Sequence, residues 1–149
     1  MSIQPVRLFI DPVLHKPVEL ITDFTGLDNL AQDMIETMLE YKGIGLAANQ
    51  IGVNKNLAAL YVEDQTKIIL VANIKITRYN KETNVLNEAC LSCPGVSVPI
   101  RRYNGIEIEA QKLNGEKVTY QFEGFDARIL QHEFDHLNGK LISNNLMHL

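Results

Sequence analysis

The sequence predicts an α+β fold in one domain that covers residues 1–149. Three observations lead to this class: an apolar helical stripe near the start, several strand-like runs in the middle, and a second helical pattern near the end. Strands grouped between helices, rather than alternating with them, are typical of α+β domains. A chain of 149 residues with 46% hydrophobic side chains can bury one core. We expect antiparallel strands packed around a central second helix, with the first helix near the N-terminus.

The first part of the chain combines an extended segment with a helix. Residues 1–22 contain three prolines and little periodicity, which predicts a segment that wraps around the domain. This helix should face the core, because its apolar residues recur at helical spacing. They are Leu27, Leu30, Ala31, Met34, Ile35, Met38 and Leu39. We expect Thr25 to cap its start and Gly43 to be the C′ residue that ends it.

The middle and the end of the chain supply the strands and the second helix. Runs of strand-like composition cover residues 57–62, 68–76, 96–100, 105–112 and 117–122. Between the last two, Asn114 and Gly115 form a pair that is typical of a β-hairpin turn. Residues 125–138 then read as a helix, with Asp126 as its cap and Gly139 at its end.

Composition argues against several classes of partner. The net charge of −4 leaves no basic excess for nucleic acid or an anionic membrane, and we interpret Arg101-Arg102 as solvated surface. No apolar run approaches the roughly 20 residues that span a bilayer. The N-terminus lacks the pattern of a secretory signal, so the two cysteines are expected in a reducing cytosol. We expect neither a membrane partner nor sequence-specific nucleic-acid binding.

The stretch QHEFDHLNG, residues 131–139, carries two histidines and an acid on the predicted second helix. His132 and His136 are four residues apart, so both imidazoles can bind one metal ion from the same side. Glu133 has the position of the general base in HExxH metal sites. Two alternatives stay open: a surface helix with two incidental histidines, and a zinc endopeptidase, although such proteases normally use a histidine or a carboxylate as third ligand.

Cys90 and Cys93 are the candidates for a third ligand. Two imidazoles and the Cys90 thiolate would leave one tetrahedral position open, as catalytic sites require. Both cysteines together would instead close a structural zinc site, and a redox disulfide between them is another interpretation. The long gap to His132 argues against a zinc finger. An extended chain would also turn the two thiols to opposite faces, although a tight turn at Ser92-Cys93-Pro94 would remove this second argument. We therefore interpret Cys93 as a small buried residue.

The loop GIGLAANQIG, residues 43–52, lacks the phosphate-binding pattern GxxxxGK[ST]. Its glycines allow close approach of the backbone to a ligand. Gln50 carries a neutral amide that can donate a hydrogen bond to an oxyanion. The alternative is a helix end followed by an ordinary turn, with Gln50 exposed.

Together, GIGLAANQ (43–50), EACLS (88–92) and QHEFDHLNG (131–139) resemble the three motifs of the peptide deformylases, in the same order. The resemblance covers nearly the whole chain. It implies a metal-dependent hydrolase that removes the N-formyl group from the N-terminal methionine of newly made polypeptides and releases formate. It also implies one divalent cation, natively Fe(2+), with Zn(2+), Ni(2+) or Co(2+) able to take its place.

The resemblance assigns roles to individual residues. The metal ligands would be Cys90, His132 and His136, and Glu133 would be the catalytic acid and base. Gln50 and the backbone N–H of Leu91 would stabilise the formyl oxygen. The substrate cleft would be lined by Ile44, Gly45 and Ile129. The partners would be N-formylmethionyl nascent peptides and the ribosome, in the cytoplasm of a bacterial or phage-infected cell, or in an organelle.

The sequence departs from the family pattern at three places. Ala89 replaces the usual glycine before the cysteine, which puts the substrate range in question because only glycine adopts positive φ freely. Ile74 follows Asn73 where the family often has proline. Ten residues, 140–149, follow Gly139, so we expect a short form that lacks the longer C-terminal helix of many relatives and ribosome docking through it.

Overall fold

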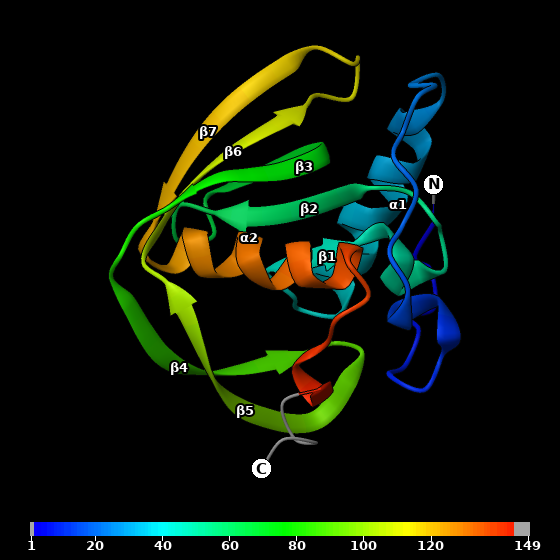
Figure 1. The fold of residues 1–149 in the computed structure, drawn as a ribbon. Coiled ribbons are helices and arrows are strands. Elements are labelled where there is room, and N and C mark those ends of the chain that lie inside the picture. Colours follow the sequence, from blue (N-terminus) through cyan, green and yellow to red (C-terminus); the bar gives the residue numbers. More distant parts are fainter. Residues whose placement is uncertain (1, 145–149) are drawn as a thin grey trace.

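The computed structural model describes residues 2–144 and confirms the α+β fold (Figure 1). The prediction of one domain over residues 1–149 reaches beyond this range at both ends and stays a prediction. The elements follow in the order η1 (Pro12–His15), α1 (Leu27–Glu40), β1 (Gly45–Ala47), η2 (Ala48–Ile51), β2 (Leu57–Val62), β3 (Lys67–Tyr79), β4 (Thr83–Cys90), β5 (Cys93–Tyr103), β6 (Gly105–Gln111), β7 (Lys117–Glu123) and α2 (Gly124–Leu137).

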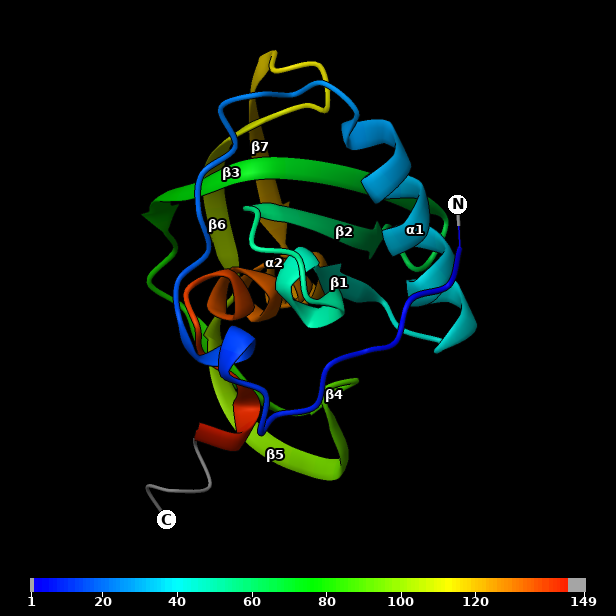
Figure 2. The ribbon, with the colours of Figure 1, turned by 90° about the vertical axis from the view of Figure 1, so that its right-hand side faces the viewer.

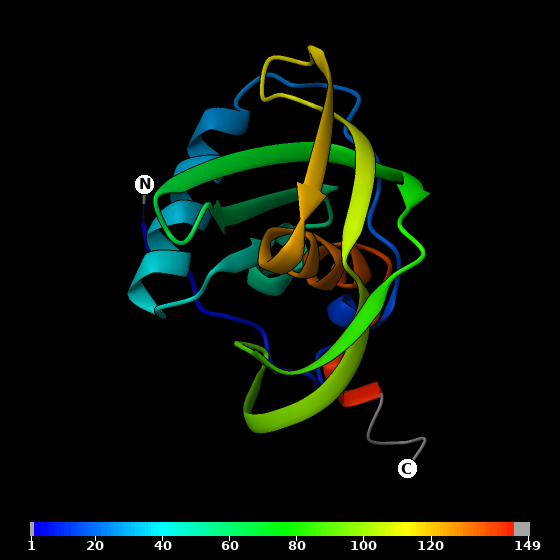
Figure 3. The same ribbon diagram turned by 90° about the vertical axis from the view of Figure 1, so that its left-hand side faces the viewer.

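The strands form two antiparallel sheets with α2 between them. The larger sheet has five strands in the order β1-β2-β3-β6-β7, and β4 pairs with β5 in a separate two-stranded sheet. In Figure 1, the larger sheet arches over α2 and the β4–β5 hairpin lies below it. Figure 3 shows the chain running from β5 directly into β6, so that the smaller sheet continues into the larger one near the end of α2. Helix α2 is therefore central, as expected.

Both faces of strand β2 are apolar, and each face is covered by a different helix. Its residues alternate between two core clusters: Leu57 and Ala59 pack with α1, whereas Ala58 and Leu60 pack with α2. Successive side chains of a strand point to opposite faces, so a fully apolar strand needs cover on both sides. Figure 2 shows α1 and α2 on opposite sides of β2. This packing fixes the position of α2 within the core.

The helix ends differ in detail from the predictions. Gly26, not Thr25, is the N-cap of α1. Lys42, with φ 56°, is the C′ residue, and the Gly43 N–H donates to Met38 O over 2.8 Å, so Gly43 stands one position later in a Schellman motif. The prediction of Asp126 as a cap is also wrong.

Glu123 is the N-cap of α2, and the Asp126 carboxylate instead accepts a hydrogen bond from the Glu63 N–H. Gly139 is confirmed as the residue that ends α2, with φ 77°. The N-terminal segment is confirmed as largely extended, apart from the short helix η1.

The N-terminal segment crosses the end of α2. The Val18 N–H donates to Leu137 O over 3.0 Å. A Cβ atom at Gly139 would lie only 2.6 Å from Lys16 N, so only glycine permits this crossing. The extended segment therefore holds the end of the helix that carries the two histidines.

At the remaining departure from the family pattern, Ile74 makes use of an atom that proline lacks. Its backbone N–H donates to Asn56 Oδ1 over 3.1 Å. Asn73 has φ 53°, and its side chain bonds both the Ile21 backbone and Gln111. The Asn73-Ile74 pair thus ties β3 to the N-terminal segment.

Candidate metal centre

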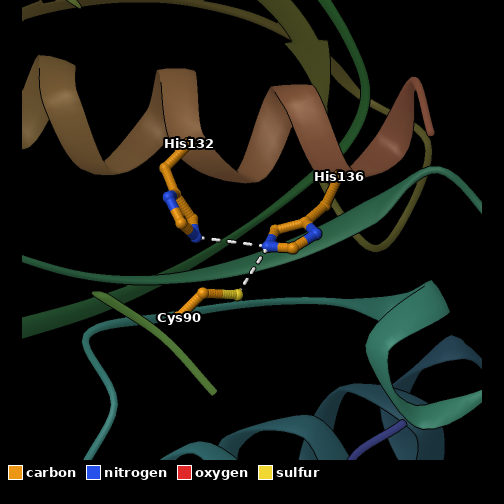
Figure 4. A group of neighbouring side chains, drawn as sticks. All are labelled: Cys90, His132 and His136. Carbon is orange, nitrogen blue, oxygen red and sulfur yellow. Dashed lines mark hydrogen bonds between the residues drawn. The ribbon is translucent and has the colours of Figure 1, made fainter. Parts of the chain in front are cut away.

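Helix α2 and strand β4 bring three metal-binding side chains together. His132 and His136, one turn apart on α2, place their Nε2 atoms 3.2 Å from each other. Cys90, the last residue of β4, places Sγ 3.2 Å from His136 Nε2 (Figure 4). One donor atom from each residue lies within 4.8 Å of the others. The structure thus brings together the three predicted ligands, although Cys90 precedes both histidines by more than forty residues in the chain.

The chemistry of this trio fits a borderline divalent cation. Two imidazole nitrogens and a thiolate are donors that Zn²⁺, Fe²⁺ and related ions accept. His136 is fully buried, and burial lowers the pKa of its imidazole, which keeps it neutral as a ligand must be. A hydrogen bond with Cys93, burial and the nearby Glu133 charge raise the pKa of the Cys90 thiol. A cation would have to displace that proton, and its charge would favour the thiolate.

Glu133 lies beside this trio in a buried position. Its side chain is 3% exposed, and Oε1 has no hydrogen-bond partner among the described residues. Burial raises the pKa of Glu133 to about 7, so the carboxyl can exchange a proton near neutral pH. An unpartnered buried carboxyl oxygen is costly unless a ligand completes its hydrogen bonding. Glu133 is therefore placed for proton transfer next to the donor atoms.

Glu88 organises the opposite side of His132. Its Oε1 lies 3.0 Å from His132 Nδ1, and it also bonds Arg102 and Arg128. Burial alone would raise the pKa of Glu88, but hydrogen bonds from His132 and Arg102, together with the charge of Arg102, lower it to about 2. The ionised carboxylate accepts the Nδ1 proton of His132, which leaves Nε2 free to bind a cation.

Four residues of this surrounding network were missed in the sequence: Glu88, Ser92, Arg102 and Arg128. The interpretation of Arg102 as solvated surface was wrong: it is 9% exposed and pairs with Glu88 and Asp135, at 2.9 and 2.5 Å. One signal was present, since Glu88 and Cys90 are two residues apart and share one face of a strand. It could be used only once β4 was known.

The glycine loop places Gln50 inside the protein. Gln50 is 1% exposed, its Oε1 accepts from Ala47 N, and its Nε2 donates to Ser92 Oγ over 3.1 Å. The same Nε2 lies 3.7 Å from Cys90 Sγ. The alternative of an exposed Gln50 is therefore wrong, and its amide N–H group faces the candidate metal centre.

Gly45 packs directly against Glu133. A Cβ atom at position 45 would collide with Glu133 Oε2 and would lie 3.0 Å from Cγ and Cδ of the same side chain. Any side chain at position 45 would occupy the space of the Glu133 carboxyl, so only glycine fits there. The backbone of β1 thus limits the movement of this carboxyl.

A cavity of about 350 Å³ opens onto the centre. Its walls include all the residues predicted for the substrate cleft and for catalysis: Ile44, Gly45, Gln50, Leu91, Ile129 and Glu133. Cys90, His132 and Ala89 also line it. A larger cavity, about 530 Å³, touches His132 and His136 from another side but includes neither Cys90 nor Glu133. The smaller cavity is therefore the candidate substrate cleft.

Ala89 sits in β4, opposite Ser97, and outside the positive-φ region. The position therefore does not need the conformational freedom of glycine. Its methyl group adds to the wall of the cavity.

Cys93 is a buried residue, 1% exposed, as interpreted from the sequence. A tight turn at residues 91 and 92 sets it opposite Cys90. It is not part of the group of mutually close donor atoms within residues 2–144. This arrangement does not support a closed four-ligand zinc site.

The sequence of the chain matches the family model described as "Polypeptide deformylase" over residues 3–149. The chain belongs to this family. Similar peptide deformylases include that of Thermotoga maritima, 41% identical over 142 residues that cover 95% of this chain and 85% of that protein. That of Thermus thermophilus is 38% identical over 159 residues, 97% of this chain and 82% of that protein.

Solved peptide deformylase structures have the same fold. The crystal structure from Thermotoga maritima superposes with a TM-score of 0.92 at 39% identity and covers 97% of each chain. A Met-Ala-Ser-bound structure from Acinetobacter baumannii gives a TM-score of 0.92 at 29% identity, over 97% of this chain and 99% of that one. The chain is therefore a metal-dependent hydrolase that removes the N-formyl group from nascent peptides, and the expected resemblance is confirmed.

This assignment decides against the endopeptidase interpretation of the HExxH motif and against a domain that zinc merely stabilises. Within residues 2–144 of this deformylase, no helix is both long enough and apolar enough to cross a membrane.

Proposed function

We propose that Cys90, His132 and His136 hold one divalent cation and that Glu133 is the catalytic acid and base of the deformylation. The observation that carries this proposal is the convergence of the three donor atoms within 4.8 Å beside the buried carboxyl of Glu133. Fe(2+) is proposed as the native ion, and Zn(2+), Ni(2+) or Co(2+) as ions that a purified sample can contain. The donor set of two nitrogens and one sulfur suits all four.

Cys90, His132 and His136 would hold a cation that would act as a Lewis acid and would make water nucleophilic near neutral pH. Glu133 holds the proton taken from that water on its carboxyl and then passes it to the nitrogen of the leaving peptide. Its pKa of about 7 matches both tasks, because it can accept and return a proton at neutral pH. Gly45 keeps the carboxyl in place during both transfers, since the backbone there packs against its oxygen.

Negative charge develops on the formyl oxygen during the reaction, and hydrogen-bond donors are needed to stabilise it. The side-chain N–H of Gln50 and the backbone N–H of Leu91 are proposed to stabilise it. Gln50 is oriented by Ala47 and Ser92, so its amide is already positioned before substrate arrives. Preorganised donors of this kind stabilise a transition state without a reorganisation cost.

The methionine side chain is proposed to occupy the apolar part of the 350 Å³ cavity, between Ile44 and Ile129. Glu88 and Arg128 also line this cavity, but they pair with each other at 2.5 Å, so they present little net charge to an apolar side chain. The peptide beyond methionine would leave the cavity past Ala89. Substrates would therefore be N-formylmethionyl nascent chains.

We further propose that the enzyme works in the cytoplasm of a bacterial cell, because the relatives named above are bacterial. Contact with the ribosome stays a prediction from the family resemblance. The expected lack of a longer C-terminal helix falls largely on residues 145–149, which lie outside the described residues.

The test is formate release from formyl-Met-Ala-Ser by iron-loaded protein. We expect turnover by the wild type, and no release by metal-loaded protein at micromolar concentration would overturn the proposal. Glu133→Gln should retain the metal and lose at least a hundredfold in kcat, in line with the roughly 10²–10⁴-fold contribution of general acid–base catalysis. Cys90→Ala should lose the metal, whereas Cys93→Ala should keep it. The opposite pattern for the two cysteines would contradict the ligand assignment.

A further inference from the structure

Cys93 is a thiol that the proposed mechanism does not use. It begins β5, and Cys90 ends β4, so that a two-residue turn separates the two cysteines. Cys90 and Cys93 are paired partners in this hairpin. Both are free thiols, and both belong to the apolar cluster beneath the hairpin. Two thiols have thus been placed side by side at the edge of the metal centre.

The hairpin geometry suits a disulfide. The ladder shifts register between Ala89 and Cys90, so the pair stands at the irregular end of the hairpin. The ends of a four-residue turn lie within about 7 Å of each other, which overlaps the roughly 4.4–6.8 Å range of Cα distances in disulfides. Their side chains also project to the same face of the hairpin. Cys93 raises the pKa of the Cys90 thiol and Cys90 lowers that of the Cys93 thiol, which indicates that the two groups interact. The two thiols are therefore close enough in the hairpin to be candidates for a disulfide.

The two thiols differ in their access to solvent. Cys90 lines the 350 Å³ cavity, whereas Cys93 is 1% exposed and does not line it. A small oxidant that enters the cavity meets Cys90 first. Cys93 is then the nearest thiol that can react with the oxidised sulfur.

We propose that Cys93 is a resolving thiol and that a peroxide converts Cys90 and Cys93 into a reversible disulfide. The Cys90 thiolate attacks one peroxide oxygen, the O–O bond breaks, and the other oxygen leaves as hydroxide, which takes up a proton from the solvent to become water. This forms a sulfenic acid on Cys90. The Cys93 sulfur then attacks the Cys90 sulfur, the S–O bond breaks, and a second water leaves with the Cys93 proton. Two thiols are oxidised by two electrons and one hydrogen peroxide is reduced.

The disulfide has a consequence for the metal, and this part rests on the proposed role of Cys90 as a ligand. A sulfur in a disulfide no longer offers a thiolate, so the centre is left with two imidazoles and binds the cation more weakly. A dithiol reductant restores the thiolate. Without Cys93, the sulfenic acid proceeds to sulfinic and sulfonic acids, which such reductants do not reverse. Cys93 therefore protects a residue whose over-oxidation would be permanent.

The experiment uses full-length, zinc-loaded protein, because zinc itself does not change its redox state. Wild type and Cys93→Ser are treated with excess hydrogen peroxide, and released zinc is measured with a zinc-chelating dye. Intact mass and peptide mapping then identify the oxidised species. Samples are finally treated with dithiothreitol and tested for zinc rebinding. Cys93→Ala is the second variant if Cys93→Ser does not fold.

The wild type should lose the mass of two hydrogen atoms, show a Cys90–Cys93 linkage, release zinc, and regain it after reduction. The Cys93 variant should gain oxygen atoms on Cys90 and regain several-fold less zinc. Oxygen addition to the wild type without the linkage would overturn the proposal, as would equal recovery of the variant. A linkage that forms without zinc release would instead refute Cys90 as a ligand, so this failure is distinguishable from a failure of the thiol chemistry.

Discussion

The Glu88 carboxylate lies 3.0 Å from His132 Nδ1 and connects strand β4 to helix α2. The same strand ends two residues later in Cys90. One strand therefore carries both a proposed ligand and the acid that orients another ligand. Arg102 and Arg128 hold Glu88 from the other side, so the position of this carboxylate is fixed by three partners.

Glu88→Gln should weaken metal binding. The amide can accept a hydrogen bond from His132 Nδ1 but lacks the negative charge that makes the imidazole a stronger donor to a cation. Loss of such an outer partner typically costs about 10–100-fold in metal affinity. Competition with a chelator of known zinc affinity measures the change. Glu109→Gln, at an exposed position in β6, is the matched control, and an equal loss in both variants would contradict a specific role.

The stability of the metal-free protein should depend on Glu88 at acid pH. Its pKa is about 2 in the folded protein, against a reference value of 4.5, so the unfolded chain binds more protons between these values. The contribution of Glu88 is thus fully present above pH 4.5 and is lost as the pH falls toward 2. We expect the difference in unfolding free energy between wild type and Glu88→Gln to shrink across this window. Urea unfolding with a chelator, repeated at several pH values, tests it; a constant difference would contradict the assignment.

Gly45→Ala should reduce turnover and leave the metal bound. The new Cβ would collide with Glu133 Oε2, so the carboxyl must move away from its place beside the metal centre. We expect kcat to fall by tenfold or more, which corresponds to about 1.4 kcal/mol in the barrier. Gly105→Ala is the control, because Gly105 does not line this cavity and its Cβ would lie 3.3 Å from the Asn80 side chain. Similar kcat values for Gly45→Ala and the wild type would show that Glu133 is not held by this contact.

Ile129→Ala should impair recognition of methionine. Ile129 lines the cavity and is 4% exposed, and a lost apolar contact in such a pocket is worth about 1–3 kcal/mol. We expect kcat/KM for formyl-Met peptides to fall by about 10–100-fold, mostly through KM. Ile108→Ala removes an equally buried side chain that does not line this cavity, so it should lower stability without raising KM. A raised KM in both variants would point to general loosening of the fold.

The existence and type of most elements followed from the sequence, but their ends did not. The stripe of α1 and the Asn-Gly hairpin are local patterns, and the hairpin was confirmed. Most of the stripe was confirmed too, but the prediction that Leu39 faces the core was wrong, because its side chain is 45% exposed. Strand β4 escaped prediction because most of its residues are exposed and no apolar face is needed. Pairing with β5, rather than burial, holds it in place. The predicted C′ residue of α1, Gly43, was wrong by one position, because Lys42 adopts the left-handed conformation that usually favours glycine.

Sequence motifs predicted the ligands of the metal centre but not the residues that surround them. Cys90, His132 and His136 were named before the fold was known, and the structure brings them together. The network around Glu88 was not predicted, because Arg128 lies forty residues away in sequence and reaches Glu88 only through tertiary packing. Charged residues are ordinarily exposed, so burial of Arg102 and Arg128 has no signal in composition.

The crossing of residues 16–18 over Gly139 joins the N-terminal segment to the end of α2. During synthesis the opening segment emerges first, yet this clasp can close only after residue 139 has left the ribosome. An enzyme that serves unfinished polypeptides thus gains the fixed position of its own two imidazoles only after the whole stretch between residues 18 and 139 has been synthesised.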